Sequence, residues 1–156
     1  MAMTAALMMS GSVAQAQDVN IGRSNITLTS DLMTPETLWA MGRIGAAQAS
    51  PDGKKIVYQV GYYSVKENKG HQVLRVMDAD GKNDRLLTTS AKSEGDAAWL
   101  DNNTLAFLTG GQLWTMNADG TNRKQLTHSD IDIEGFRFSP DRSVLFLSRA
   151  SLTMAL

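Results

Sequence analysis

The side chains that could carry catalysis are few in this chain, and their spacing does not favour a catalytic site. His71 and His128 are the two histidines, and cysteine is absent. A serine nucleophile needs a histidine base and an orienting carboxylate, usually brought together by the fold from distant parts of a sequence. Ser129 and Asp130 directly follow His128, a spacing that does not favour such a triad. We therefore predict that both histidines are solvated loop residues and that the chain holds no catalytic residue.

Metal and cofactor chemistry is equally poorly supported by the residue types. Two histidines without cysteine make a poor zinc site. The segment 78–84 resembles a calcium loop, but its glycine, Gly81, stands at the fourth position instead of the sixth, and Lys82 occupies a ligand position. An Asp-Gly step favours a tight hairpin turn instead. We predict hairpin turns here, with no metal ligand and no cofactor.

Two adjacent tyrosines are the candidate contact residues. Tyr62 and Tyr63 lie in the segment 61–72, which lengthens the first repeat described below. The other aromatic residues fall at strand positions of that repeat, where packing between sheets explains them. Exposed aromatic side chains on an inserted hairpin are typical of contact surfaces. We expect Tyr62 and Tyr63 to lie at the surface, where they would contact a partner or control substrate access.

The elements that position these residues come from an internal repeat. Residues 76–88 are echoed by 115–127 at an offset of 39, and residues 50–58 return as 139–147 with a degenerate copy at 99–107. A period of about 40 to 50 residues is typical of β-propellers, in which each repeat is a four-stranded blade. The sequence therefore predicts an all-β fold, a partial β-propeller with two blades and part of a third.

Local patterns predict a helix followed by strands. Thr34 and Pro35 suit the cap and first position of a helix over 36–41 that Gly42 would end. We expect the apolar side chains of this helix to pack against the first blade; they are Leu38, Trp39 and Met41. Short apolar runs predict strands at 56–60, 73–77, 104–108, 112–116 and 144–147.

The N-terminal segment has the character of an export signal. Residues 1–16 carry no charge and end in Ala14-Gln15-Ala16, the small-x-small pattern that signal peptidase accepts. The charged start of a signal is missing, so we expect the true start to lie upstream. We predict a clipped signal peptide over 1–16, an arm and short helix over 17–44, and the partial propeller over 45–156. The mature chain would be periplasmic or secreted.

Bulk composition excludes several classes of partner. The net charge is -1, with 42% hydrophobic and 20% charged residues, which is typical of a soluble globular protein. No basic patch favours nucleic acid, and no segment is long and apolar enough to span a membrane.

Two sets of motifs resemble known families. The Ser-Pro-Asp-Gly phrase at 50–53 and the Ala-Asp-Gly phrases at 79–81 and 118–120 resemble the WD40-like repeats of TolB-type propellers. Residues 33–44, followed by Ser-Pro-Asp-Gly, Tyr62-Tyr63 and 67–69, resemble the start of the prolyl oligopeptidase (S9) family, with its bacterial dipeptidyl-peptidase V and acylaminoacyl-peptidase-like members.

The S9 resemblance implies a seven- or eight-bladed propeller that restricts access to an α/β-hydrolase domain with a Ser-Asp-His triad. The sequence contains no Gly-x-Ser-x-Gly nucleophile elbow. We therefore expect a noncatalytic propeller fragment of an exported S9-type serine peptidase, whose peptide substrates would bind through the missing hydrolase domain. Whether this chain is itself an enzyme stays open, and we expect it to be inactive alone. The alternatives are a TolB-like periplasmic propeller that binds a protein partner, and a nonfunctional truncated product.

Overall fold

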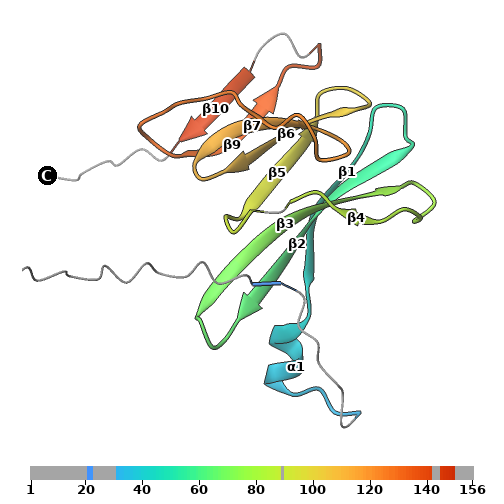
Figure 1. Ribbon diagram of the computed structural model, residues 1–156, viewed down its shortest axis with the longest axis vertical. Coiled ribbons are helices and arrows are strands. Elements are labelled where there is room, and N and C mark those ends of the chain that lie inside the picture. The colour runs from blue at the N-terminus through green and yellow to red at the C-terminus, as the bar shows by residue number, and fades with distance from the viewer. Residues whose placement is uncertain (1–20, 23–30, 89, 142–144, 150–156) are drawn as a thin grey trace, which may run out of the picture.

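The structure is built from antiparallel strands preceded by one short helix (Figure 1). The computed structural model describes residues 21–22, 31–88, 90–141 and 145–149, so the predicted signal segment 1–16 lies outside the described residues. The elements are α1 (Pro35–Ala40), β1 (Arg43–Ala49), β2 (Lys55–Ser64), β3 (Lys69–Asp78), β4 (Arg85–Leu86), β5 (Glu94–Trp99), β6 (Thr104–Thr109), β7 (Gln112–Asn117), β8 (Lys124–Gln125), β9 (Ile133–Phe138) and β10 (Leu145–Arg149). None of the helices in the described ranges is long and apolar enough to cross a membrane.

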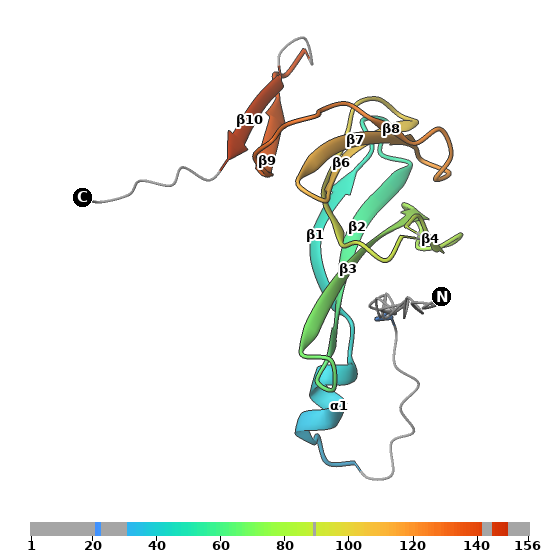
Figure 2. The same ribbon diagram turned by 60° about the vertical axis from the view of Figure 1, so that its left-hand side comes forward.

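Three sheets follow one another along the chain, and the first two have the same topology. The first has the order β1-β2-β3-β4 and the second the order β5-β6-β7-β8, while β9 and β10 form a hairpin. Each strand pairs antiparallel with the next along the chain, which is the meander of a propeller blade. The predicted all-β fold, with two blades and part of a third, is confirmed, and the described sheets do not close into a ring (Figure 2).

The main core lies between the two complete blades. Its first-blade members are Val57, Leu74, Val76 and Leu87, and its second-blade members are Trp99, Leu105, Phe107, Met116 and Ala118. All of them are buried, and burying each large side chain contributes about 1.5–3 kcal/mol. A smaller core of Ala106, Leu113 and Phe136 joins the second blade to β9. The two blades therefore bury their apolar faces against each other, as neighbouring repeat units do.

The hairpin of β2 and β3 is the longest in the structure. The two strands pair without interruption from Lys55 opposite Asp78 to Ser64 opposite Lys69. The segment 61–72 is therefore a hairpin extension, as predicted from the repeat spacing. The tip of this hairpin lies beside α1 and points away from the second blade (Figures 1 and 2).

The N-terminal half of the helix prediction is confirmed, and the C-terminal half needs correction. Thr34 caps α1 through its Oγ1, which accepts a hydrogen bond of 3.2 Å from the backbone N–H of Thr37, and Pro35 is the first helical residue. The structure shows no left-handed cap at Gly42, since its φ is not positive. A Cβ there would instead lie 2.8 Å from Cε1 of Tyr62, so this glycine permits close packing.

The predicted packing of the helix against the first blade is confirmed for Trp39, whose ring lies 4.9 Å from that of Tyr63 on β2, but none of the three predicted side chains is buried. Leu38, Trp39 and Met41 remain 47%, 41% and 43% exposed, and α1 contains no buried residue. The helix contacts the end of β2 beside the hairpin tip and lies outside the interface between the blades, which explains why its side chains stay partly exposed.

Candidate functional site

The two histidines lie in different environments, and neither belongs to a catalytic triad among the described residues. His128 is an exposed loop residue, as predicted. His71 is 6% exposed on β3, so the prediction of a solvated loop histidine was wrong for it. Both of its ring nitrogens face backbone carbonyl oxygens, those of Ile21 and Lys92. The hydroxyl of Ser129 donates to the carbonyl of Ile131 and does not face either histidine.

The predicted turns are present where a calcium loop was considered. Gly81 has φ of +82°, and the backbone N–H of Lys82 donates to Oδ1 of Asp80 at 3.0 Å. The ammonium of Lys82 lies 2.8 Å from the other oxygen of Asp80 and neutralises it. The described part of the chain holds no group of three or more side chains suited to a metal ion.

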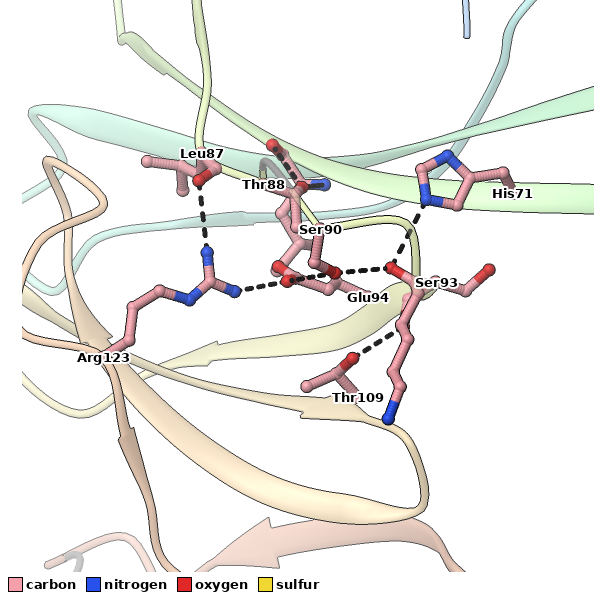
Figure 3. A network of polar contacts seen from close by, with 10 residues as sticks. His71, Leu87, Thr88, Ser90, Ser93, Glu94, Thr109 and Arg123 are labelled. Carbon is pink, nitrogen blue, oxygen red and sulfur yellow. Dashed lines mark hydrogen bonds and ion pairs between the residues drawn. The ribbon is translucent and has the colours of Figure 1, made fainter. Parts of the chain in front are cut away.

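A buried ion pair lies at the junction of the two blades, where sequence reasoning did not place one (Figure 3). Glu94, at the start of β5, is 1% exposed, and its Oε1 accepts a charge-assisted hydrogen bond from the guanidinium of Arg123. The Arg123 guanidinium lies 5.0 Å over the ring of Phe107 and also reaches the carbonyl of Leu87 at 3.5 Å. Arg123 thus joins the end of the first blade to the start of the second.

The environment of Glu94 opposes its charge. Burial raises the pKa of the Glu94 carboxyl, while Arg123, Ser90 and His71 act in the opposite direction. The hydroxyl of Ser90 donates to Oε1 at 3.3 Å, whereas Oε2 has no hydrogen-bond partner in the described part of the chain. A buried carboxylate with one unsatisfied oxygen is costly, so this pair is sensitive to any change in its partners.

The loop segment 90–93, called here the inter-blade linker, is held by backbone and side-chain contacts around this pair. The backbone N–H of Gln72 donates to Oγ of Ser93 at 3.1 Å, and Thr109 Oγ1 donates to the carbonyl of Ser93 at 3.1 Å. Ser90 Oγ lies 3.0 Å from the carbonyl of Lys92, which also faces His71. Figure 3 shows His71, Ser90, Ser93 and Glu94 gathered at this junction.

The candidate contact tyrosines lie beside α1 on β2. The centroid of the Tyr63 ring is 4.9 Å from that of the Trp39 ring. The guanidinium of Arg43 lies 4.6 Å over the same Trp39 ring. Tyr63 also donates its hydroxyl to Oδ1 of Asn68 in the hairpin turn. Tyr62 and Tyr63 are both half-buried, and Tyr62 packs against Gly42. Their proposed contact role stays a prediction.

A cavity of about 500 Å³ opens where the first strands of the three sheets meet. Its apolar wall includes Trp99 and Phe136, and its charged side chains are Asp96 and Arg137. Asp96 is a non-glycine residue with φ of +50°, at the bulge where β5 shifts register against β6. The Asp96 backbone N–H donates to Oε1 of Gln59 at 3.3 Å, which fixes this bulge against the first blade.

Glu94 and Arg123 were missed because a charged residue in a short polar segment is usually exposed. One sequence signal marks the strand position of the first of them. Glu94-Gly95 recurs as Glu134-Gly135 forty residues later, at the start of β5 and within β9. Glu134 is exposed, however, so this recurrence does not predict that Glu94 is buried.

Two curated relatives match most of this chain. The dipeptidyl-peptidase 5 of Porphyromonas endodontalis is 35% identical over 120 residues, which make up 74% of this chain and 17% of that relative. The dipeptidyl-peptidase 5 of Porphyromonas gingivalis is 41% identical over 126 residues, or 77% of this chain and 18% of that relative. The chain therefore spans less than a fifth of the length of these relatives. No protein-family model matches it.

Solved structures share the fold at low sequence identity. An oligogalacturonate lyase in complex with manganese superposes with a TM-score of 0.53 at 21% identity, covering 67% of this chain and 34% of the other. The Pyrococcus horikoshii acylaminoacyl peptidase gives 0.55 at 12% identity, covering 71% of this chain and 18% of the other. The resemblance to the dipeptidyl-peptidase V members of the prolyl oligopeptidase (S9) family is confirmed by the curated relatives, over the part of them that this chain spans.

Proposed function

We propose that this chain is the noncatalytic propeller segment of an exported S9-type serine peptidase. The observation that carries the proposal is its 35–41% identity to two dipeptidyl-peptidase 5 proteins over about three quarters of its length. The sequence holds no nucleophile elbow, and the described residues form a structural β scaffold without a triad. In this proposal the blades support a hydrolase domain and restrict the peptides that reach it.

Substrate restriction would use two surfaces, the cavity where the first strands of the three sheets meet and the tip of the hairpin formed by β2 and β3. The cavity formed by the first strands presents one carboxylate, Asp96, and one guanidinium, Arg137, on a wall that mixes apolar side chains with the amides of Gln48 and Gln59. A peptide carries both charges at its ends and an amide backbone between them, so such a wall suits it. Tyr62 and Tyr63 would act from the hairpin beside α1, where the Trp39 ring supports Tyr63.

Export would follow from the Ala14-Gln15-Ala16 pattern that precedes Gln17. A mature chain starting at Gln17 would retain every residue that the structure describes. The absence of cysteine fits an oxidising compartment, since no thiol is present to be oxidised.

A chimeric enzyme tests the proposal. The segment of the Porphyromonas gingivalis protein that aligns with this chain is replaced by the matching residues of this chain. We expect the chimera to release dipeptides from chromogenic dipeptidyl substrates, and the isolated 156-residue chain to release none. When the predicted upstream start of the signal is restored ahead of residues 1–16, the exported chain should begin at Gln17 by N-terminal sequencing. A soluble, folded chimera without activity, or cleavage by the isolated chain, would contradict the proposal.

The gating role has its own readout in the same chimera. Tyr63→Ala should change KM for dipeptidyl substrates several-fold and leave kcat nearly unchanged, because the side chain would act on entry and not on the reacting atoms. Val65→Ala is the matched control, since Val65 is an exposed residue of the same hairpin tip. Equal kinetic parameters for both variants and the unchanged chimera would remove Tyr63 from the gate.

A further inference from the structure

We propose that the cavity where the first strands meet binds an extended peptide by its backbone carbonyl oxygens, with the side-chain amides of Gln48 and Gln59 as the donors. Recognition would then depend on main-chain atoms of the peptide and not on its side chains. This rests on the proposed function, from which peptides are taken as the substrate class.

The oxygen of each amide is already engaged by the second blade. Oε1 of Gln48 accepts a hydrogen bond of 3.0 Å from the backbone N–H of Trp99, and Oε1 of Gln59 accepts one of 3.3 Å from that of Asp96. A backbone N–H only donates, so the atom that faces it must be the amide oxygen and not the amide nitrogen. The indole N–H of Trp99 also donates to the backbone carbonyl of Gln48 at 3.0 Å. Both amides therefore have one defined orientation.

The amide nitrogens of these two side chains are unused donors. Nε2 of Gln48 and Nε2 of Gln59 have no hydrogen-bond partner within the described ranges of the chain. Both residues line the cavity, Gln48 exposed on β1 and Gln59 half-buried on β2. Each amide NH2 group carries two N–H donors. A ligand that enters the cavity therefore meets donors that need acceptor oxygens.

The spacing of the two amides matches an extended chain. Gln48 pairs with Val57 across β1 and β2, and Gln59 stands two residues further along β2 on the same face. Such diagonal neighbours lie about 7–8 Å apart. In an extended peptide the carbonyls of residues i and i+2 point the same way and lie about 6.6–6.8 Å apart, because each residue rises about 3.3–3.4 Å. One extended peptide can thus place one carbonyl oxygen at each amide.

The rest of the cavity suits a peptide main chain. Its volume of about 500 Å³ lies within the range of about 300–1,000 Å³ that is usual for ligand sites. Small side chains beside the amides leave room for a backbone; they are Ala46, Ala47, Ala97 and Ala98. From β9, Arg137 adds N–H donors beyond the Nη1 that it directs at the carbonyl of Phe136 at 2.7 Å. The carboxylate of Asp96 can accept from a peptide N–H.

Glutamate substitutions separate the donor from the structural acceptor. Gln59→Glu keeps an oxygen for the backbone N–H of Asp96 but has no N–H to donate. Gln48→Glu does the same at the backbone N–H of Trp99. Gln72→Glu is the matched control, because Gln72 on β3 is a diagonal neighbour of Gln59 on the same face but lies outside the cavity wall. The control adds the same negative charge without removing a donor from the cavity.

NMR titration of the full 156-residue chain with acetyl-penta-alanine amide tests the inference. This probe has no charged end, so it cannot bind as an ion pair with Asp96 or Arg137. We expect the indole N–H resonance of Trp99 to shift on addition of the peptide. The indole resonances of Trp39 and Trp114, which lie outside the cavity wall, should stay in place.

The variants and a second probe test which atoms are read. Gln48→Glu and Gln59→Glu should each raise Kd about fivefold, the size of one lost hydrogen bond, and Gln72→Glu should leave Kd within about twofold. A polyproline II chain has three residues per turn and repeats its carbonyl direction only about every 9.3 Å. Acetyl-penta-proline amide should therefore bind at least about fivefold more weakly than the alanine probe.

Kinetics of the chimera give a second measurement if the isolated chain or a variant fails to fold. With a penta-alanine substrate, Gln48→Glu and Gln59→Glu should raise KM several-fold and leave kcat nearly unchanged, because the amides would bind the chain away from the reacting atoms. A folded chimera without activity contradicts the proposed function. An active chimera whose KM is unchanged by both substitutions contradicts only the binding site.

Three results with the folded isolated chain would overturn the inference. The first is a Trp99 resonance that does not respond to the alanine probe. The second is equal affinity for the alanine and proline probes. The third is a Trp99 resonance that shifts with protein concentration alone, since a second copy of the chain would then occupy the cavity.

Discussion

Removing the charge of Arg123 should strongly lower the free energy of unfolding, because Arg123 pairs with the buried Glu94 where the two blades meet. The guanidinium is the charged partner of Glu94, whose carboxylate is 1% exposed and has one oxygen without a hydrogen-bond partner among the described residues. Arg123→Met keeps the length of the side chain and its contact with the ring of Phe107 but leaves the Glu94 carboxylate uncompensated.

The magnitude follows from the burial of the surviving charge. Breaking a buried ion pair by removing one partner costs about 3–5 kcal/mol. The side chain of Arg123 is 27% exposed, which screens part of the interaction, so we expect a loss of about 3 kcal/mol in the free energy of unfolding at pH 7.5. Burial already raises the pKa of Glu94, and loss of Arg123 should raise this pKa further.

The pH dependence of the stability loss distinguishes a lost ion pair from a packing defect, which would lower stability equally at both pH values. A carboxyl whose pKa is higher in the folded state than in the unfolded state binds its proton more tightly when folded. The variant should therefore regain stability as the pH falls below the folded pKa of Glu94, and lose it as the pH rises through that value. Urea unfolding followed by tryptophan fluorescence at pH 7.5 and pH 5 measures both effects, because Trp99 lies in the same core.

Two companion variants separate charge from packing. Glu94→Gln in the Arg123→Met background removes the orphaned charge and should restore most of the lost stability. Lys124→Met, at the exposed neighbouring position, should change stability by less than about 0.5 kcal/mol. A loss below about 1 kcal/mol for Arg123→Met, or an equal loss at both pH values, would refute the reasoning.

Two further substitutions test local features of the first blade. Gly42→Ala should lower the free energy of unfolding by about 1–3 kcal/mol, because the new Cβ would lie 2.8 Å from Cε1 of Tyr62. Urea titration measures this loss. Gly45→Ala is the control and should lower the free energy of unfolding by less, since the nearest atom to its new Cβ is 3.5 Å away. Asp84→Asn should cost about 0.5 kcal/mol at pH 7, a value discounted for the exposure of the pair with Arg75. The Arg75 hydrogen bonds lower the pKa of Asp84, so this stabilisation is present above the ordinary carboxyl range and is lost as the pH falls through the folded pKa; a difference between the variant and the natural chain that persists at pH 2 would contradict it.

The middle strands of each blade were predictable from sequence, and the first strands were not. The runs at 56–60 and 104–108 are rich in aliphatic and aromatic side chains, and both lie in paired strands, β2 and β6. Strand β5 reads Glu-Gly-Asp-Ala-Ala-Trp, a composition with low intrinsic strand propensity. It becomes a strand because it pairs with β6 around a bulge at Asp96, and such tertiary pairing leaves no local signal.

Burial of the polar residues was also beyond the local pattern. His71 belongs to a segment that the repeat spacing marks as inserted, and an inserted segment suggests a solvated loop. The strand pairing continues through the insertion, so His71 stands opposite Tyr62 on a ladder and faces the arm and the linker. Whether an inserted hairpin extends a sheet or leaves it depends on long-range contacts that residue types alone do not specify.

A comparison of equivalent positions in the two blades explains why the buried pair occurs at one place. Ile44 stands opposite Val60 in the first blade as Glu94 stands opposite Thr109 in the second, and each precedes a glycine. Asp84 takes the place of Arg123 after the repeated Asp-Gly turn.

In the second blade these positions form the Glu94–Arg123 pair, which the first blade covers. In the first blade Asp84 binds Arg75 and Tyr58 on its own sheet, and Ile44 is 73% exposed. The backbone repeat thus sets where two side chains meet, and the residue types at those positions decide what they do. At this strand position the second blade has a charged residue, Glu94, which the first blade covers and buries. The first blade has an apolar residue, Ile44, at the same position, and no described residue covers it.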